Sequence, residues 1–187
     1  MSFATQDLRD EHQGILAMLA VVEAAAFRVR DGKAVPRDLM LNASEFFRNF
    51  ADKCHHGKEE DRLFPKMIES GISDAGGPIG VMKEEHIRGR ALVGAMLDAA
   101  QKFAQGDASV TRELARTTLD YVALLRDHID KEDNVFFPEA DRAIPESVQR
   151  ALKQSYDEFE ANVMGAGVHE RYHAMIDAYQ KLAASWK

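Results

Sequence analysis

The stretch LARTTLDYVALLRDHIDKEDNVFFP, residues 114–138, decides the fold. Its apolar residues recur at alternating spacings of four and three, which is the period of one face of an α-helix. Side chains at these spacings are buried where helices pack side by side. Two members of this row, His128 and Glu132, are polar. The stretch therefore predicts one helix of a bundle, with a histidine and a glutamate on its inward face. The full row is Leu114, Thr118, Tyr121, Leu125, His128, Glu132 and Val135.

The same period runs through the rest of the chain, and no alternating strand pattern accompanies it. We expect an all-α fold in which four long helices form an up-down-up-down bundle over residues 1–138. Glycines and prolines mark their ends. The four helices are expected at about residues 7–30, 36–70, 78–105 and 109–137, the last ending at Pro138.

A C-terminal extension over residues 139–187 is expected to follow this bundle. Its two helices are predicted at about residues 145–163 and 168–185, with a glycine hinge between them. The extension is expected to pack on the bundle, so the chain divides into a bundle domain and a two-helix appendage.

Composition excludes several classes of protein. The net charge of −7 argues against a nucleic-acid-binding surface, which needs clustered lysine and arginine. Cys54 is the single cysteine, so an internal disulfide and a multi-cysteine metal site are excluded. Residues 1–12 lack the apolar core of a signal peptide, and no apolar run approaches about 18 residues. We therefore expect a cytoplasmic protein with no membrane or nucleic-acid partner.

Each of the four bundle helices places a histidine in or beside its inward row, and two add a glutamate one turn further on. In an up-down-up-down bundle these positions meet at one end. Burying imidazoles and carboxylates together is costly unless a counter-ion compensates them, and a pair of divalent metals would do so. Nitrogen and oxygen ligands suit iron, manganese or zinc. The predicted ligands are His12, His56, Glu60, His86, His128 and Glu132.

Two sequence segments resemble the two half-motifs of the hemerythrin-like HHE cation-binding domain. They are HHGKEEDRLFP at residues 55–65 and HIDKEDNVFFP at residues 128–138. The resemblance covers roughly residues 5–138. It implies a four-helix bundle that carries a non-haem di-iron centre. Carried over by position, Glu60 and Glu132 would be the bridging carboxylates, and the four histidines would be terminal ligands.

The chain departs from oxygen-carrying hemerythrins at two positions. Those proteins have a His-x-x-x-His pair on the third helix, and here Arg90 takes the second place. They also use a carboxylate five residues after the fourth-helix histidine, which here is Asp133, whereas Glu132 is four residues after it. Fewer protein ligands leave more open coordination positions, which favours reactivity or sensing over oxygen carriage. Arg90 either pairs with a carboxylate near the site or points outwards.

His55 and Glu59 form a second pair with the same spacing as His56 and Glu60. We favour His56 and Glu60, because the Leu-Phe that follows Glu60 then stands at the family's spacing. His55 and Glu59 stay open as alternative ligands.

Three more residues could belong to a site or to ordinary structure. Tyr121, two turns before His128, could bond a ligand or simply fill the core. His169 and His173 are four residues apart on the last predicted helix, a spacing that can hold one metal. They could equally lie on a solvated helix face.

These observations predict a metal protein that binds or senses O2, NO, peroxide or iron through a carboxylate-bridged iron pair. An enzyme-like role is the alternative, either peroxide decomposition or iron donation in iron–sulfur cluster repair. Two other hypotheses stay open. One is a sensor whose last two helices repack about Gly165 and Gly167, and the other is a bundle with no metal. The extension could pack on its own bundle or on a neighbour's, so a homodimer stays open.

Overall fold

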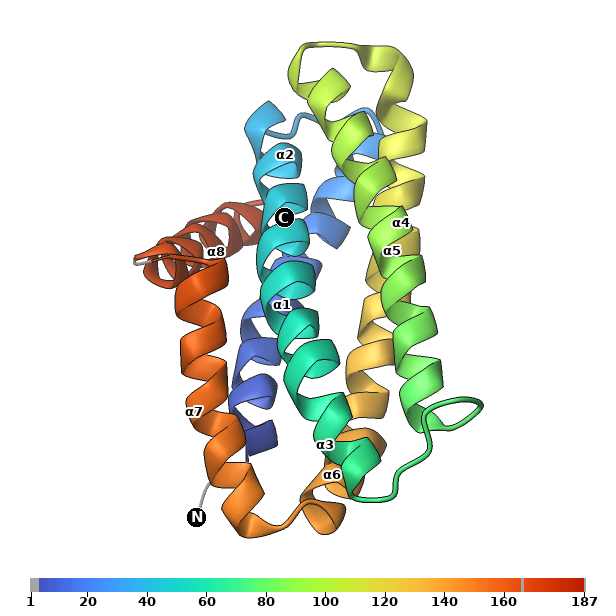
Figure 1. Ribbon diagram of the computed structural model, residues 1–187. Coiled ribbons are helices and arrows are strands. Elements are labelled where there is room, and N and C mark those ends of the chain that lie inside the picture. The colour runs from blue at the N-terminus through green and yellow to red at the C-terminus, as the bar shows by residue number, and fades with distance from the viewer. Residues whose placement is uncertain (1–3, 166, 187) are drawn as a thin grey trace.

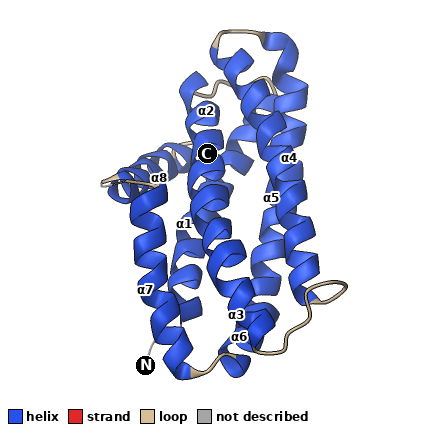
Figure 2. Cartoon of the chain, viewed as in Figure 1, coloured by secondary structure: helices blue, strands red, loops and turns tan. Residues whose placement is uncertain are grey.

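The computed structural model describes residues 4–165 and 167–186, and every regular element in that part of the chain is a helix (Figures 1 and 2). Four helical rods run side by side, as the apolar periodicity predicts. The first and third rods are α1 (Ala4–Arg30) and α4 (Pro78–Ala104). The second rod comprises α2 (Arg37–Phe46), η1 (Phe47–His56), η2 (Glu59–Leu63) and α3 (Phe64–Glu69). The fourth comprises η3 (Ala108–Val110), α5 (Thr111–Lys131), η4 (Glu132–Phe136) and α6 (Phe137–Ala143).

Glycine ends the rods where the chain must turn back. Gly32, after α1, and Gly106, after α4, have φ angles of 69° and 96°. These left-handed conformations strain residues that carry a Cβ atom, so glycine is the residue that closes such helix ends.

The fourth rod does not end at Pro138, contrary to the sequence expectation. It continues as α6 to Ala143, and the second rod likewise continues past Pro65. In both rods a π-helical segment, η2 or η4, lies immediately before the Phe-Pro pair. Proline cannot donate a backbone hydrogen bond and crowds the preceding turn. A wider π-helical turn accommodates this defect and lets the rod proceed.

The buried side chains form two apolar clusters, separated by a polar layer. On α1 one cluster ends at Leu8 and the other begins at Ile15, with His12 between them. On α4 the same boundary falls between Met82 and Val93. The bundle therefore has a defined level at which buried polar groups gather.

Two further helices, α7 (Glu146–Val163) and α8 (Val168–Ala184), pack on the outside of the bundle (Figure 1). Helix α7 contacts α1, η1 and η2, and α8 crosses α1. The side chain of Ile176 reaches Gly14 of α1, and Asn42 donates a 2.7 Å hydrogen bond to the Tyr179 hydroxyl. The extension thus covers the face of the bundle formed by the first two rods.

Helix α1 is the one helix in residues 4–165 and 167–186 that is long and apolar enough to cross a membrane by composition. Its most apolar window has a mean hydropathy of 1.3, and 50% of that window is buried within the protein. This is a property of the window average, since Glu23 interrupts the apolar run of α1. A helix that packs against several others in a bundle has the same composition.

Candidate metal centre

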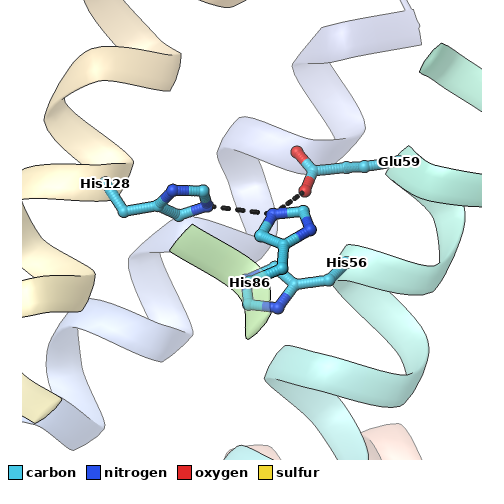
Figure 3. Close-up of side chains that lie close together, drawn as sticks. All are labelled: His56, Glu59, His86 and His128. Carbon is cyan, nitrogen blue, oxygen red and sulfur yellow. Dashed lines mark hydrogen bonds and ion pairs between the residues drawn. The ribbon is translucent and has the colours of Figure 1, made fainter. Parts of the chain in front are cut away.

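The polar layer contains two groups of metal-ligating side chains. The first brings together the side chains of His56, Glu59, His86 and His128, all of them buried (Figure 3). Their ligand atoms lie within 4.8 Å of one another. The Nε2 atoms of His86 and His128 are 3.2 Å apart, and the rings of His56 and His86 stack with centroids 4.0 Å apart. Three histidines from three rods therefore converge on one point.

The second group consists of His12, His55 and Glu132, which are also buried. The Nε2 atoms of His12 and His55 are 3.0 Å apart. His12 comes from α1 and His55 from η1, so this group lies on the side of the layer that faces the first two rods.

The two buried carboxylates lie between the groups. Glu132 places Oε1 3.1 Å from His128 Nε2 in the first group and Oε2 3.2 Å from His12 Nε2 in the second. Glu59 places Oε2 3.3 Å from His86 Nε2 and Oε1 3.8 Å from His55 Nε2. Each carboxylate therefore directs one oxygen to each group, which is the arrangement of a carboxylate that bridges two ions.

These carboxylate oxygens lack ordinary partners. Histidine nitrogens approach within 3.1–3.8 Å, yet no contact among the described residues aligns as a hydrogen bond to either oxygen of Glu59 or Glu132. Both side chains are completely buried. Buried carboxylates without hydrogen bonds are strongly destabilising unless a cation compensates them. The donor set of imidazole nitrogens and carboxylate oxygens therefore fits a pair of divalent metal ions.

Outer carboxylates orient the imidazoles. The Nδ1 atoms of four histidines bond carboxylates on their outer side, with distances of 2.6–2.9 Å. An imidazole held at Nδ1 presents Nε2 as a ligand in a fixed direction and gains basicity. His56 is the exception, because Asp52 lies 3.6 Å from its Nδ1. The bonded pairs are His12 with Asp133, His55 with Glu11, His86 with Glu60 and His128 with Glu85.

Burial and charge set the protonation of the layer. Burial lowers the pKa of His56 well below its ordinary value, and His86 and His128 lower it further, so His56 is a neutral ligand at pH 7. Burial also opposes the charge on His12, but Asp133 and Glu132 outweigh it and raise the pKa of His12 to about 9. In the same way Glu132 and other carboxylates outweigh burial and raise the pKa of His128 to about 10. The carboxylate neighbours therefore favour the protonated form of both imidazoles.

The ligand set in the structure differs from the predicted set at two residues: Glu59 takes the place of Glu60, and His55 is added. Of the six predicted ligands, the structure brings all but Glu60 into the two groups. Glu60 is partly exposed and accepts from His86 Nδ1, while Glu59 takes the inward position. The structure also adds His55 beside His56. Both differences arise in the π-helical second rod, where the 3.6-residue period does not hold, and the family's spacing of the Leu-Phe that follows Glu60 did not identify the inward glutamate.

Arg90 and Asp133, whose roles the sequence did not decide, lie just outside the two histidine groups. Arg90 donates to Asp52 at 2.7 Å and to Glu60 at 2.8 Å. It therefore pairs with carboxylates that face the ligand histidines, one of its two sequence interpretations. Asp133 accepts from His12, so it supports a ligand from outside.

The other candidates belong to neither group. Tyr121 is buried and packs edge-on against Phe47. The rings of His169 and His173 meet edge to face, with 4.6 Å between centroids, and line a cavity of about 390 Å³ between the bundle and the extension. Within the described residues neither joins a group of metal-ligating side chains.

Comparison with known proteins agrees with this geometry. The description "Hemerythrin HHE cation binding domain" matches residues 4–140, which includes all the residues of both groups. The match ends within α6, before the two extension helices begin.

Similar proteins include relatives with and without an assigned role. The iron–sulfur cluster repair protein YtfE of Yersinia pseudotuberculosis is 33% identical over 148 residues, 75% of this chain and 64% of the relative. The YtfE protein of Yersinia pestis is similar to the same extent. An uncharacterised protein of Mycobacterium tuberculosis is 26% identical over 164 residues, 87% of this chain and 63% of the relative. The chain thus spans less than two thirds of the length of these relatives.

Proposed function

Since this chain belongs to the hemerythrin HHE cation-binding domain family, we propose that it is a non-haem di-iron protein that binds O2, NO or peroxide at its metal pair. The observation that carries the proposal is the placement of Glu59 and Glu132, each with one oxygen towards either histidine group. One ion would be held by His56, His86 and His128. The other would be held by His12 and His55, with the two carboxylates shared. Manganese or zinc would suit the same ligands.

The two proposed metal positions differ in the number of histidine ligands that surround them. The second group contributes one histidine fewer than the first, so it leaves more coordination positions for a small ligand. Iron, when bound by these residues, would supply open positions and a change of oxidation state. The protein supplies apolar walls that limit access of water, since Phe137 stacks on His12 and Phe64 on His86.

Absorption spectroscopy of the iron-loaded protein tests this proposal. We expect the spectrum of the anaerobic protein to change when O2, NO or peroxide is added, and the change to be lost in the His12→Ala variant. Recovery of the original spectrum under vacuum would indicate reversible binding, whereas sustained oxygen evolution from peroxide would indicate an enzyme. A spectrum that none of the three ligands alters would contradict the proposal.

Iron–sulfur cluster repair is the second candidate function, and the similarity to YtfE favours it. In that case the metal pair would serve as a source of iron for a damaged cluster. The test is to mix the iron-loaded protein with an enzyme whose cluster has been damaged by peroxide. Recovery of that enzyme's activity should require iron loading and should fail with Glu132→Ala. Equal recovery with the variant would contradict this role.

A further inference from the structure

Helix α7 lies directly against the segment that carries His55, His56 and Glu59. The ring of Phe159 occupies the space that a side chain at Gly57 would need, because a Cβ atom there would lie 2.8 Å from Phe159 Cζ. The guanidinium of Arg62 lies 5.1 Å above the same ring. Phe159 lies beyond residue 140, where the family match ends. This chain's extension therefore covers the metal-ligating segment closely.

A line of hydrogen bonds joins α7 to one ligand histidine. His55 donates from Nδ1 to Glu11 Oε2 at 2.8 Å. The other oxygen of Glu11 accepts from the Lys58 ammonium group, which also donates to Glu160 Oε2 at 2.8 Å. Lys58 is only 3% exposed, so its charge depends on these two carboxylates. Glu160 of α7 is thus connected to His55 through Lys58 and Glu11.

His128 of the first histidine group has a similar line of hydrogen bonds, formed by bundle residues and not by the C-terminal extension. His128 donates from Nδ1 to Glu85 at 2.9 Å, and Lys131 donates both to Glu85 and, at 2.6 Å, to Asp127. All four residues belong to the bundle. The two arrangements have the same chemistry, histidine to glutamate to lysine to carboxylate. They differ in that the extension supplies the last carboxylate only for His55.

We propose that Glu160 is a positioning residue for the metal ion held by His12 and His55. The inference rests on the proposed di-iron function and extends it to a residue outside the recognised domain. Without Glu160, the buried Lys58 charge is balanced by Glu11 alone and draws that carboxylate towards itself. Glu11 then accepts more weakly from His55, which loses orientation and basicity as a ligand. The C-terminal helices would thereby complete one half of the metal centre.

Release of iron to a coloured chelator tests the proposal. The full-length protein is loaded with two Fe²⁺ per chain under anaerobic conditions, and the two release phases are compared. Loss of an outer partner typically weakens metal binding by about 10–100-fold. We expect Glu160→Gln to speed release of one ion by about tenfold and to leave the other at the wild-type rate. Lys58→Met removes the group that competes with His55 for Glu11, so it should change the release rate of the same ion and not that of the other. Glu158→Gln, two residues away and exposed on α7, is the matched control.

The outcomes separate this inference from the function on which it rests. If wild-type protein binds two ions and Glu160→Gln releases both at wild-type rates, Glu160 is not a positioning residue and the di-iron function stands. Equal acceleration of both ions would indicate general loosening of the bundle and would also contradict the proposal. A wild-type chain that binds fewer than two ions would overturn the proposed function, and this inference with it.

Discussion

The Nε2 atoms of His12 and His55 face each other at 3.0 Å in the buried interior of the bundle. Each ring is held from behind by a carboxylate at Nδ1, so both rings present Nε2 to the same point. Two nitrogens that each offer a lone pair repel at this distance unless a proton or a cation lies between them. This pair would hold one of the two proposed ions.

Replacement of His55 should therefore affect one ion more than the other. We expect His55→Ala to retain about one Fe²⁺ per chain at concentrations that saturate two in the wild type, because His56, His86 and His128 remain. Metal analysis after gel filtration measures this directly. His173→Ala, a histidine outside both groups, should keep two ions. If His55→Ala also keeps two, His55 is not a ligand.

Glu59 and Glu60 offer a sharper comparison, because they are adjacent and chemically identical. Glu59→Gln removes a buried bridging charge and should abolish binding of the metal pair. Glu60→Gln weakens the contacts of this outer side chain with His86 Nδ1 and Arg90 but removes no group that faces both histidine groups, so it should weaken binding by about 10–100-fold. Titration with Fe²⁺, monitored by absorption, measures both. A larger loss for Glu60→Gln would favour the assignment made from sequence spacing over the one made from geometry.

The helical period predicts much of this centre and fails at one place. Rows of spacing four and three are sufficient to bring His12, His86, His128 and Glu132 to one level, because α1 and α4 are regular helices there, α5 is regular up to Lys131, and Glu132 is only the first residue of η4. The second rod is π-helical across this level, and its changed period turns Glu59 inward. The Phe-Pro pairs at residues 64–65 and 137–138 are the sequence signal that could have indicated a distorted helical turn before each proline.

The contribution of the extension could not be predicted from the bundle rows. Glu160 and Phe159 lie on a helix whose pattern shows an apolar face but not which rod it covers. The hydrogen bond from Lys58 to Glu160 depends on how α7 packs on the second rod. Packing between helices so distant in sequence follows from the shapes of their surfaces and not from the helical period of either sequence.

The metal-free protein should lose stability in alkali. The pKa values of His12 and His128 are raised to about 9 and about 10 by their carboxylate neighbours, above the ordinary value of 6.5. Groups with raised folded pKa values stabilise fully below pH 6.5, and this stabilisation is lost as the pH rises through 9 to 10. Thermal unfolding between pH 7 and pH 10 should show a falling Tm for metal-free protein. The metal-loaded protein should hold its Tm over this range. Equal slopes for the two forms would contradict the explanation.

Gly57 should resist replacement although its backbone is helical. Gly57→Ala must displace the Phe159 ring, and overpacking of this kind typically costs about 1–3 kcal/mol. Gly94→Ala in α4 is the control, since no atom lies within 4 Å of its added Cβ. The control should gain about 0.5–1 kcal/mol from helix propensity. Urea unfolding of the metal-free variants measures both, and a Gly57→Ala protein as stable as Gly94→Ala would show that α7 does not pack as described.

Anomalous diffraction at the iron absorption edge, from crystals of the iron-loaded protein, tests the central claim most directly. The account predicts two anomalous peaks per chain. One should lie among the Nε2 atoms of His56, His86 and His128 and the other between His12 and His55, with Glu59 and Glu132 contacting both. A single peak, or two peaks that do not share these carboxylates, would contradict a carboxylate-bridged metal pair.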